Sequence, residues 1–321
     1  MIRALAERSV ERNFALFAIA LTLALGTFFT LWMIARSKKN RTARIRESLR
    51  RDGFPGVYEK MLAESFRPYS FLDASEKASL QEKILAFLEE KNFHGINDFE
   101  VTDEMKVLVA AEACLLILKS ESESLFPGLS NIYLVEDAYV PRENPLNPAT
   151  GRPTAGPRLG ESWKRGPIVL SWAAVKSSLN GSSGNQNVVA HEFSHQLDQQ
   201  DGKFDGTPEL GPQGNLGRWV TVMSREFLEL RAELSAHRSS RAVGGGYGHE
   251  PSREFGGGNI GSSDISSEDI DPYAATNEAE FFAVLTEYFF MNPRSLLKKH
   301  PELFGILRSY FGLDPARWAK R

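Results

Sequence analysis

The sequence predicts an α+β protein, mainly helical with a small sheet, preceded by one transmembrane helix. Three observations predict this class: an apolar run near the N-terminus, short strand-like segments after it, and helical periodicity toward the C-terminus. The 321 residues are 42% hydrophobic and 25% charged, which is enough apolar material for one large domain or two small ones. This composition excludes a mainly disordered protein.

The apolar run, residues 14–35, contains no charged residue. As a helix it is about 33 Å long at ~1.5 Å per residue, which matches the apolar core of a bilayer. A cleaved signal peptide and a buried core helix are the alternatives, but a basic segment, residues 36–51, follows the run at once. Because basic residues are retained on the cytoplasmic side, we expect a short segment 1–13, a membrane anchor and a cytoplasmic C-terminal part.

Charge and cysteine content narrow the function classes further. Residues 1–51 contain 11 Lys and Arg against 3 Asp and Glu, a net charge of +8. Because the whole chain has a net charge of −3, the remaining residues have a net charge of −11. Such an acidic body is unsuited to nucleic-acid phosphates, so we expect no nucleic-acid partner. The single cysteine, Cys114, forms no internal disulfide and is expected in the core, so any metal site must use histidines and carboxylates.

Residues 52–321 are expected to form the globular domain. Helical spacing and capping residues predict two opening helices, two strands around a Pro/Gly-rich loop, and three later helices. The elements expected in order are helices over 73–93 and 101–119, strands over 131–135 and 167–172 with the loop at about 141–162, and helices around 187–200, 216–237 and 277–290. The Gly/Ser-rich residues 239–270 predict a flexible insertion, and we read His249 within it as part of a solvated loop rather than of a second metal site.

The segment 187–202, NVVAHEFSHQLDQQDG, carries the chemistry. Residues four apart lie one above the other on a helix, so His191 and His195 can bind one ion while Glu192 lies beside that ion as a general base. Zinc suits two imidazole nitrogens and one carboxylate oxygen, with a fourth position left for water. Asp198, one turn after His195, either orients a metal-bound imidazole or is a plain solvated aspartate.

A third metal ligand must come from elsewhere, and a carboxylate is the expected type. Residues 271–290, DPYAATNEAEFFAVLTEYFF, predict a helix with acidic residues among apolar ones. Glu280 and Glu287 share a face that is otherwise apolar, so at least one of them is expected to be buried with a partner. Glu280 is the favoured ligand, Glu287 and Glu278 stay as alternatives, and Glu278 also suits the first helical turn.

Four segments together resemble the Mlc titration factor A family of zinc-dependent peptidases over about residues 52–321. They are TDEMKVLVAAEACL at 102–115, GPIVLSW at 166–172, the 187–202 segment, and YAATNEAEFFAVLTEYFF at 273–290. The active region is also similar to the catalytic domain of anthrax lethal factor. These resemblances imply a gluzincin-like, zincin-type fold that binds one Zn²⁺ through His191, His195 and Glu280, with Glu192 as general base and Tyr273 assisting the transition state.

The function expected from the sequence is that of a membrane-anchored zinc peptidase, with aminopeptidase-like activity implied by the resemblance. The strand at 167–172 is a candidate for holding an extended peptide substrate by its free edge. Two alternatives stay open: a membrane-tethered module that captures a cytoplasmic regulatory protein such as a transcriptional repressor, and a hydrolase of non-peptide amides. The anchor and the insertion depart from the compact pattern of the family, so binding to the repressor Mlc does not follow.

Overall fold

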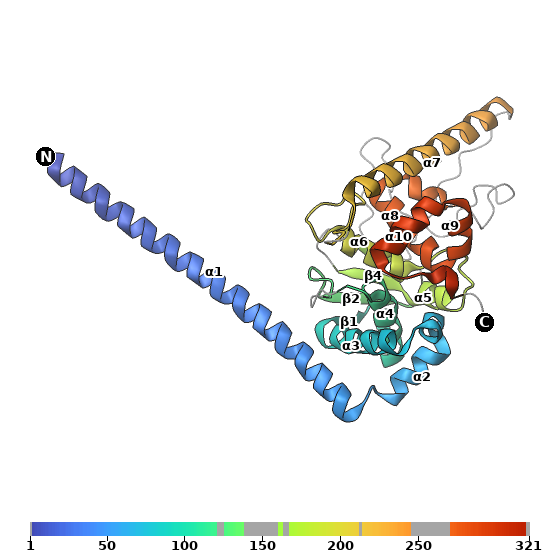
Figure 1. Ribbon diagram of the computed structural model, residues 1–321, viewed down its shortest axis with the longest axis horizontal. Helices are drawn as coiled ribbons and strands as arrows, with labels where there is room; N and C mark the ends of the chain where they lie inside the picture. The colour runs from blue at the N-terminus through green and yellow to red at the C-terminus, as the bar shows by residue number, and fades with distance from the viewer. Residues whose placement is uncertain are drawn as a thin grey trace. The chain divides into compact units, whose positions relative to one another are not determined.

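The computed structural model describes residues 2–120, 125–137, 160–162, 167–211, 214–244 and 270–318 (Figure 1). The chain divides into two compact units, Met1–Gly53 and Phe54–Arg321. In the second unit the helices and strands are α2 (Gly56–Ser65), α3 (Ala74–Glu90), β1 (Asn92–Gly95), α4 (Asp103–Leu116), β2 (Asn131–Val135), β3 (Gly160–Ser162), β4 (Ile168–Ser171), α5 (Trp172–Leu179), α6 (Val188–Asp198), α7 (Leu216–Gly244), α8 (Glu278–Met291), α9 (Pro293–Lys299) and α10 (Pro301–Phe311), with 3₁₀ turns η1 (Arg67–Phe71), η2 (Pro272–Ala275) and η3 (Pro315–Arg317). The predicted α+β class, mainly helical with a small sheet, is confirmed.

The first unit is a single helix, α1 (Ile2–Asp52). Large apolar side chains along it are exposed, among them Phe17 at 67%, Leu23 at 65% and Phe28 at 69%. Within the described residues, no helix has a stretch that is long and apolar enough to cross a membrane. The side chains of seven residues of the predicted anchor, 14–16, 18, 31, 34 and 35, are not described, and the anchor stays a prediction.

The sheet has four strands in the order β1-β2-β4-β3. β1, β2 and β4 are parallel, and β3 pairs with β4 in the antiparallel direction. The expected strands at 131–135 and 167–172 are confirmed as β2 and β4, whereas β1 and β3 were not predicted. The helix expected over 73–93 ends at Glu90, because the following residues pair with β2 instead.

Capping residues set the start of several helices. The Thr102 hydroxyl accepts the Met105 N–H at the start of α4 and satisfies one of the free donors of the first turn. Almost every residue of α4 is buried, including Cys114, because α4 packs against α2, α3 and α6. The helix expected at 216–237 continues to Gly244, so the first residues of the expected insertion are helical. Residues 245–269, including His249, lie outside the described residues, as do residues 141–159 of the expected loop. The last residues of that loop, 160–162, form β3 instead, because they pair with β4.

Two helices far apart in the sequence, α6 and α8, pack against each other (Figure 1). α6 also contacts β3, β4, α4 and α5. Aromatic contacts also join each helix to other parts of the core: Phe193 of α6 meets Phe126 edge-on, with 4.7 Å between the ring centroids, and Phe282 of α8 meets Trp219 of α7 in the same way at 5.7 Å. The apolar faces of α6 and α8 are therefore committed to the core, and this packing fixes where the polar side chains on these helices lie.

Candidate metal centre

The two histidines lie on one face of α6, as their spacing predicts. Asn187 begins this helix, since its side-chain Oδ1 accepts the Ala190 N–H at 2.9 Å. His191 and His195 follow one turn apart, and their ring centroids are 4.9 Å from each other. Both rings are largely buried, with 12% and 6% of the side chain exposed. Helix geometry alone therefore aligns two imidazoles for a common ligand.

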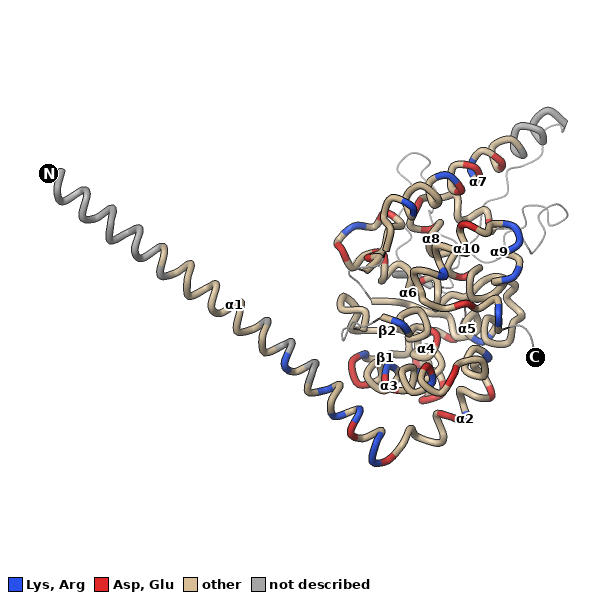
Figure 2. Tube along the Cα trace, viewed as in Figure 1, with Lys and Arg blue, Asp and Glu red and all other residues tan. Residues whose placement is uncertain are grey.

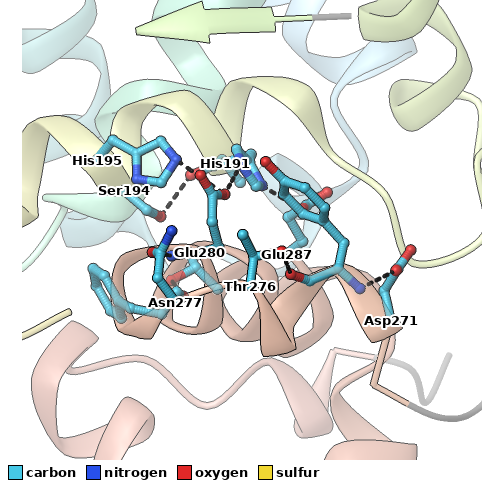
Figure 3. A network of polar contacts seen from close by, with 12 residues as sticks. His191, Ser194, His195, Asp271, Thr276, Asn277, Glu280 and Glu287 are labelled. Atoms are coloured by element: carbon cyan, nitrogen blue, oxygen red, sulfur yellow. Dashed lines mark hydrogen bonds and ion pairs between the residues drawn. The ribbon is translucent and has the colours of Figure 1, made fainter. Parts of the chain in front are cut away.

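Glu280 enters the same space from α8. The Asn277 side chain caps this helix by accepting the Glu280 N–H at 3.0 Å, which places Glu280 in the first turn. Its Oε2 lies 3.0 Å from Nε2 of His191 and 3.4 Å from Nε2 of His195. Figure 3 shows the carboxylate rising from α8 between the two imidazoles. The structure thus brings together the three residues proposed as ligands.

The donor set fits a metal ion. One ligand atom from each of the three residues lies within 4.8 Å of the other two. Two ligands on a tetrahedral zinc are separated by about 3.3 Å, which follows from bond lengths of ~2.0–2.1 Å, and both His–Glu separations are close to this value. Two imidazole nitrogens and one carboxylate oxygen are also the donors that such ions prefer. Glu278 is exposed at the start of α8, as expected of a first-turn residue and not of a ligand.

Without an ion, the carboxylates hold a proton on His191. Burial acts to lower the pKa of His191, but the charge of Glu287 and hydrogen bonds to Glu280 and Glu287 outweigh it, so the pKa lies well above its usual value. Burial lowers the pKa of His195. The pKa of Glu280 lies far below its usual range, because hydrogen bonds to the two histidines outweigh its burial. Metal binding must therefore displace a proton from His191.

Glu287, which the sequence left open as a ligand, contacts the outer nitrogen of His191 instead. Its Oε1 accepts the Nδ1–H of His191 at 2.7 Å, and its Oε2 accepts the backbone N–H of Asn187 at 2.5 Å. A carboxylate on Nδ1 fixes the tautomer that presents the Nε2 lone pair to a metal. Glu287 follows Glu280 by seven residues and lies on the same side of α8. It contacts Nδ1 of His191, whereas Glu280 contacts the Nε2 atoms that would bind the ion.

Glu192 and Tyr273 lie next to His191. Glu192 is 4% exposed, and its charge contributes to the raised pKa of His191. The Tyr273 ring lies in η2 with its centroid 6.1 Å from that of the His191 ring. Both positions are compatible with the roles that the family resemblance implies, and those roles stay predictions.

Asp198 matches neither of its two expected roles. It is fully buried, and its Oδ2 accepts the Gly206 N–H at 3.0 Å; among the described residues it has no hydrogen bond to His195. This bond ties the loop after α6 back onto the helix. The ring of Phe204 in this loop is tilted by 46° against that of His195, with 5.1 Å between the ring centroids. The reason for the difference is tertiary: the chain turns back over α6, so the carboxylate faces a backbone amide instead of water. No sequence pattern had singled out Phe204.

The strand expected to bind a peptide is unavailable for that role. β4 lies between β2 and β3, so both of its edges are already paired. The expectation at 167–172 was wrong because β3 supplies a partner that the sequence did not reveal. β3 contacts α6 and, within the described part of the chain, no strand pairs with its other edge.

Comparison with known proteins shows which family the chain belongs to. The family model for the glucose-regulated metallopeptidase M90 matches residues 37–312. The chain belongs to the M90 metallopeptidase family. A Synechocystis sp. protein designated slr2042 is 32% identical over 302 residues, covering 93% of this chain and 97% of that protein. Proteins named Mlc titration factor A are similar too: that of Serratia proteamaculans is 28% identical over 76% of this chain and 82% of its own, and that of Salmonella gallinarum 26% identical over 77% and 82%. The family resemblance stated from the sequence is confirmed, and the residues at the metal centre lie within the matched range.

Proposed function

We propose that the protein is a membrane-anchored zinc-dependent peptidase that hydrolyses peptide bonds with Glu192 as general base. The observation that carries the proposal is the convergence of His191, His195 and Glu280 beside a buried glutamate. Membership of a metallopeptidase family supports it. A structural metal site gains nothing from a carboxylate in this position, whereas a hydrolytic site needs one.

Each residue at the proposed metal centre has a separate role in the mechanism. His191, His195 and Glu280 would hold the zinc ion, which when bound supplies Lewis acidity toward a carbonyl group and toward water. Glu192 accepts a proton from the attacking water and delivers it to the leaving amine. Glu287 holds His191 in the required tautomer. Tyr273 donates a hydrogen bond to the developing oxyanion, a contact worth about 3 kcal/mol when well placed.

The free edge of β3 is the proposed support for an extended peptide. β3 adjoins α6, so a peptide paired along it would run beside the histidines. The aminopeptidase-like preference rests on the family resemblance alone. Paired peptides with free and acetylated N-termini test it: an aminopeptidase cleaves only the free form at its first bond.

The decisive experiment compares the natural protein with Glu192→Gln and with Glu278→Gln, an exposed glutamate that serves as control. We expect one zinc ion per chain in all three by elemental analysis. Peptide hydrolysis should fall by about 10²–10⁴-fold in Glu192→Gln and stay unchanged in the control, because a general base contributes this much to the rate. Equal hydrolysis by the natural protein and Glu192→Gln would refute the mechanism, and cleavage of small amides without peptides would favour the non-peptide alternative.

Residues 14–35 are the proposed membrane anchor, with the C-terminal part in the cytoplasm. The support is a charge-free sequence, exposed apolar side chains between Phe17 and Met33, and the Lys and Arg residues gathered over the last part of α1 in Figure 2. The expected result is that the full chain stays in the membrane pellet after alkaline carbonate extraction. A chain with Leu21, Leu23 and Leu25 replaced by Asp should be released, and equal extraction of both would contradict the anchor.

A second candidate function is capture of a cytoplasmic regulatory protein. The observation in its favour is the name Mlc titration factor A carried by relatives that are 26–28% identical. Pull-down with the natural protein and with Glu192→Gln separates the two functions. A partner retained equally by both, together with no hydrolysis of any peptide by the natural protein, would favour the binding role over the peptidase.

A further inference from the structure

A pocket of about 320 Å³ lies on the side of α6 that carries Asn187 and Ala190. Four aromatic side chains line it, Phe66, Phe71, Phe290 and Trp318, and the exposed Arg67, whose guanidinium lies over the Phe71 ring, is the one Lys or Arg among its lining residues. Phe71 and Trp318 are stacked, with 6.4 Å between centroids and 3° between planes. None of the three proposed metal ligands lines this pocket. Its size and apolar wall are those of a site for a small molecule with one ring.

One buried acid, Glu112 of α4, also lines the pocket. Glu112 is 6% exposed, and its Oε1 accepts the Asn187 Nδ2–H at 3.0 Å. The other oxygen, Oε2, has no hydrogen-bond partner among the described residues. Among the described residues, no cationic side chain forms a hydrogen bond or an ion pair with Glu112. Burial raises its pKa to about 8, so the carboxyl is neutral at pH 7. A neutral carboxyl whose Oε1 already accepts a bond has an O–H to donate at Oε2.

Asn187 connects this carboxyl to the metal centre. Its side chain bonds Glu112 and caps α6, and its backbone N–H donates to Glu287, the residue that holds His191. All of these contacts are buried or nearly so, and a shift of Asn187 would change the support of His191. The pocket and the metal centre are therefore two sites joined by one residue.

We propose that this pocket binds an uncharged apolar molecule of about the size of one aromatic ring, whose carbonyl oxygen accepts a hydrogen bond from Glu112, and that its occupancy changes the metal affinity through Asn187. The aromatic wall supplies the apolar contact, and the unpartnered oxygen supplies the polar one. The inference requires only a bound metal and not peptidase activity. Catalysis is therefore not part of its test.

Acetophenone and ethylbenzene are the probes, because they share a ring and differ in the carbonyl oxygen. Titration calorimetry on the zinc-loaded full chain should give at least tenfold tighter binding of acetophenone. Glu112→Gln, whose amide N–H can donate from the position of Oε2, should keep this preference, and Glu112→Leu should lose it. Glu104→Gln, an exposed glutamate of the same helix, is the matched control and should behave as the natural protein.

A wall variant keeps the test decisive if Glu112→Leu does not fold. Phe71→Ala, which is half-buried, should weaken both probes at least fivefold and leave their ratio unchanged. Equal affinity for the two probes in the natural protein, preference for benzylamine over acetophenone, or no effect of Phe71→Ala would overturn the proposed site. Saturating acetophenone should change the zinc dissociation constant at least threefold, and zinc should change acetophenone binding by the same factor. An unchanged zinc affinity would overturn the coupling.

Discussion

Replacing Glu287 by glutamine tests how the metal centre is built. Both carboxylate oxygens accept a hydrogen bond, one from Nδ1 of His191 at 2.7 Å and one from the Asn187 backbone at 2.5 Å. A glutamine has one acceptor and one donor, so it can match only one of these two donors. If its oxygen faces the backbone amide, its NH₂ faces Nδ1 and favours the tautomer with a proton on Nε2, the atom that should bind the metal.

The size of the effect follows from that mismatch. A lost hydrogen bond to a charged group costs about 1.5–3 kcal/mol. Removing a carboxylate partner of a metal-bound histidine typically lowers metal affinity about 10–100-fold, which agrees with this range. We therefore expect Glu287→Gln to bind zinc about 10–100-fold more weakly than the natural protein, with a similar circular dichroism spectrum.

Competition with a chromophoric chelator measures the zinc dissociation constant of each protein. Glu278→Gln is the control, because it changes an exposed glutamate on the same helix and should bind zinc as the natural protein does. A folded Glu287→Gln whose zinc affinity is within twofold of the natural value would refute the reasoning. It would mean that the orientation of His191 is set by helix packing without the carboxylate.

Three further predictions follow from the same contacts. Zinc binding at pH 7 should release about one proton per ion and tighten as the pH rises, because the raised pKa of His191 keeps the metal-free ring protonated. Calorimetry in two buffers of different ionisation enthalpy measures the number of protons released, and binding without proton release would contradict the prediction. Burial of Glu112 should lower the free energy of unfolding of the natural protein as the pH rises from about 4.5 to about 8, since only the unfolded chain ionises Glu112 in this range. Glu112→Gln lacks this loss, so its free energy of unfolding in urea, relative to that of the natural protein, should rise by about 3–5 kcal/mol over the same range. A difference between the two proteins that does not change with pH would argue against a neutral carboxyl. Gly206→Ala should destabilise the protein by about 1–3 kcal/mol in urea unfolding, because φ is +74° and a Cβ would collide with the backbone of Glu278. Gly184→Ala is the control and should destabilise the protein less, because Gly184 has a similar φ of +69° but no atom near the position of the added Cβ.

The sequence determined much of the fold and the centre of the site because these features depend on local spacing. The i, i+4 geometry of a helix aligns His191 and His195 whatever surrounds them. Thr102 marks the start of α4, because capping is a contact between neighbours in the sequence. Apolar periodicity likewise predicted α8, although its carboxylates could not be assigned to separate roles by spacing.

Tertiary structure alone decided which partner each polar side chain meets. Only the packing of α8 on α6 places Glu280 between the two imidazoles and Glu287 behind one of them. The strands β1 and β3 escaped prediction because each is four residues or fewer and is defined by its neighbour in the sheet. Asp198 holds the loop after α6, because that loop turns back and brings the Gly206 backbone amide to its carboxylate. Spacing along a helix is a property of the chain, whereas contacts between elements exist only once the core has formed.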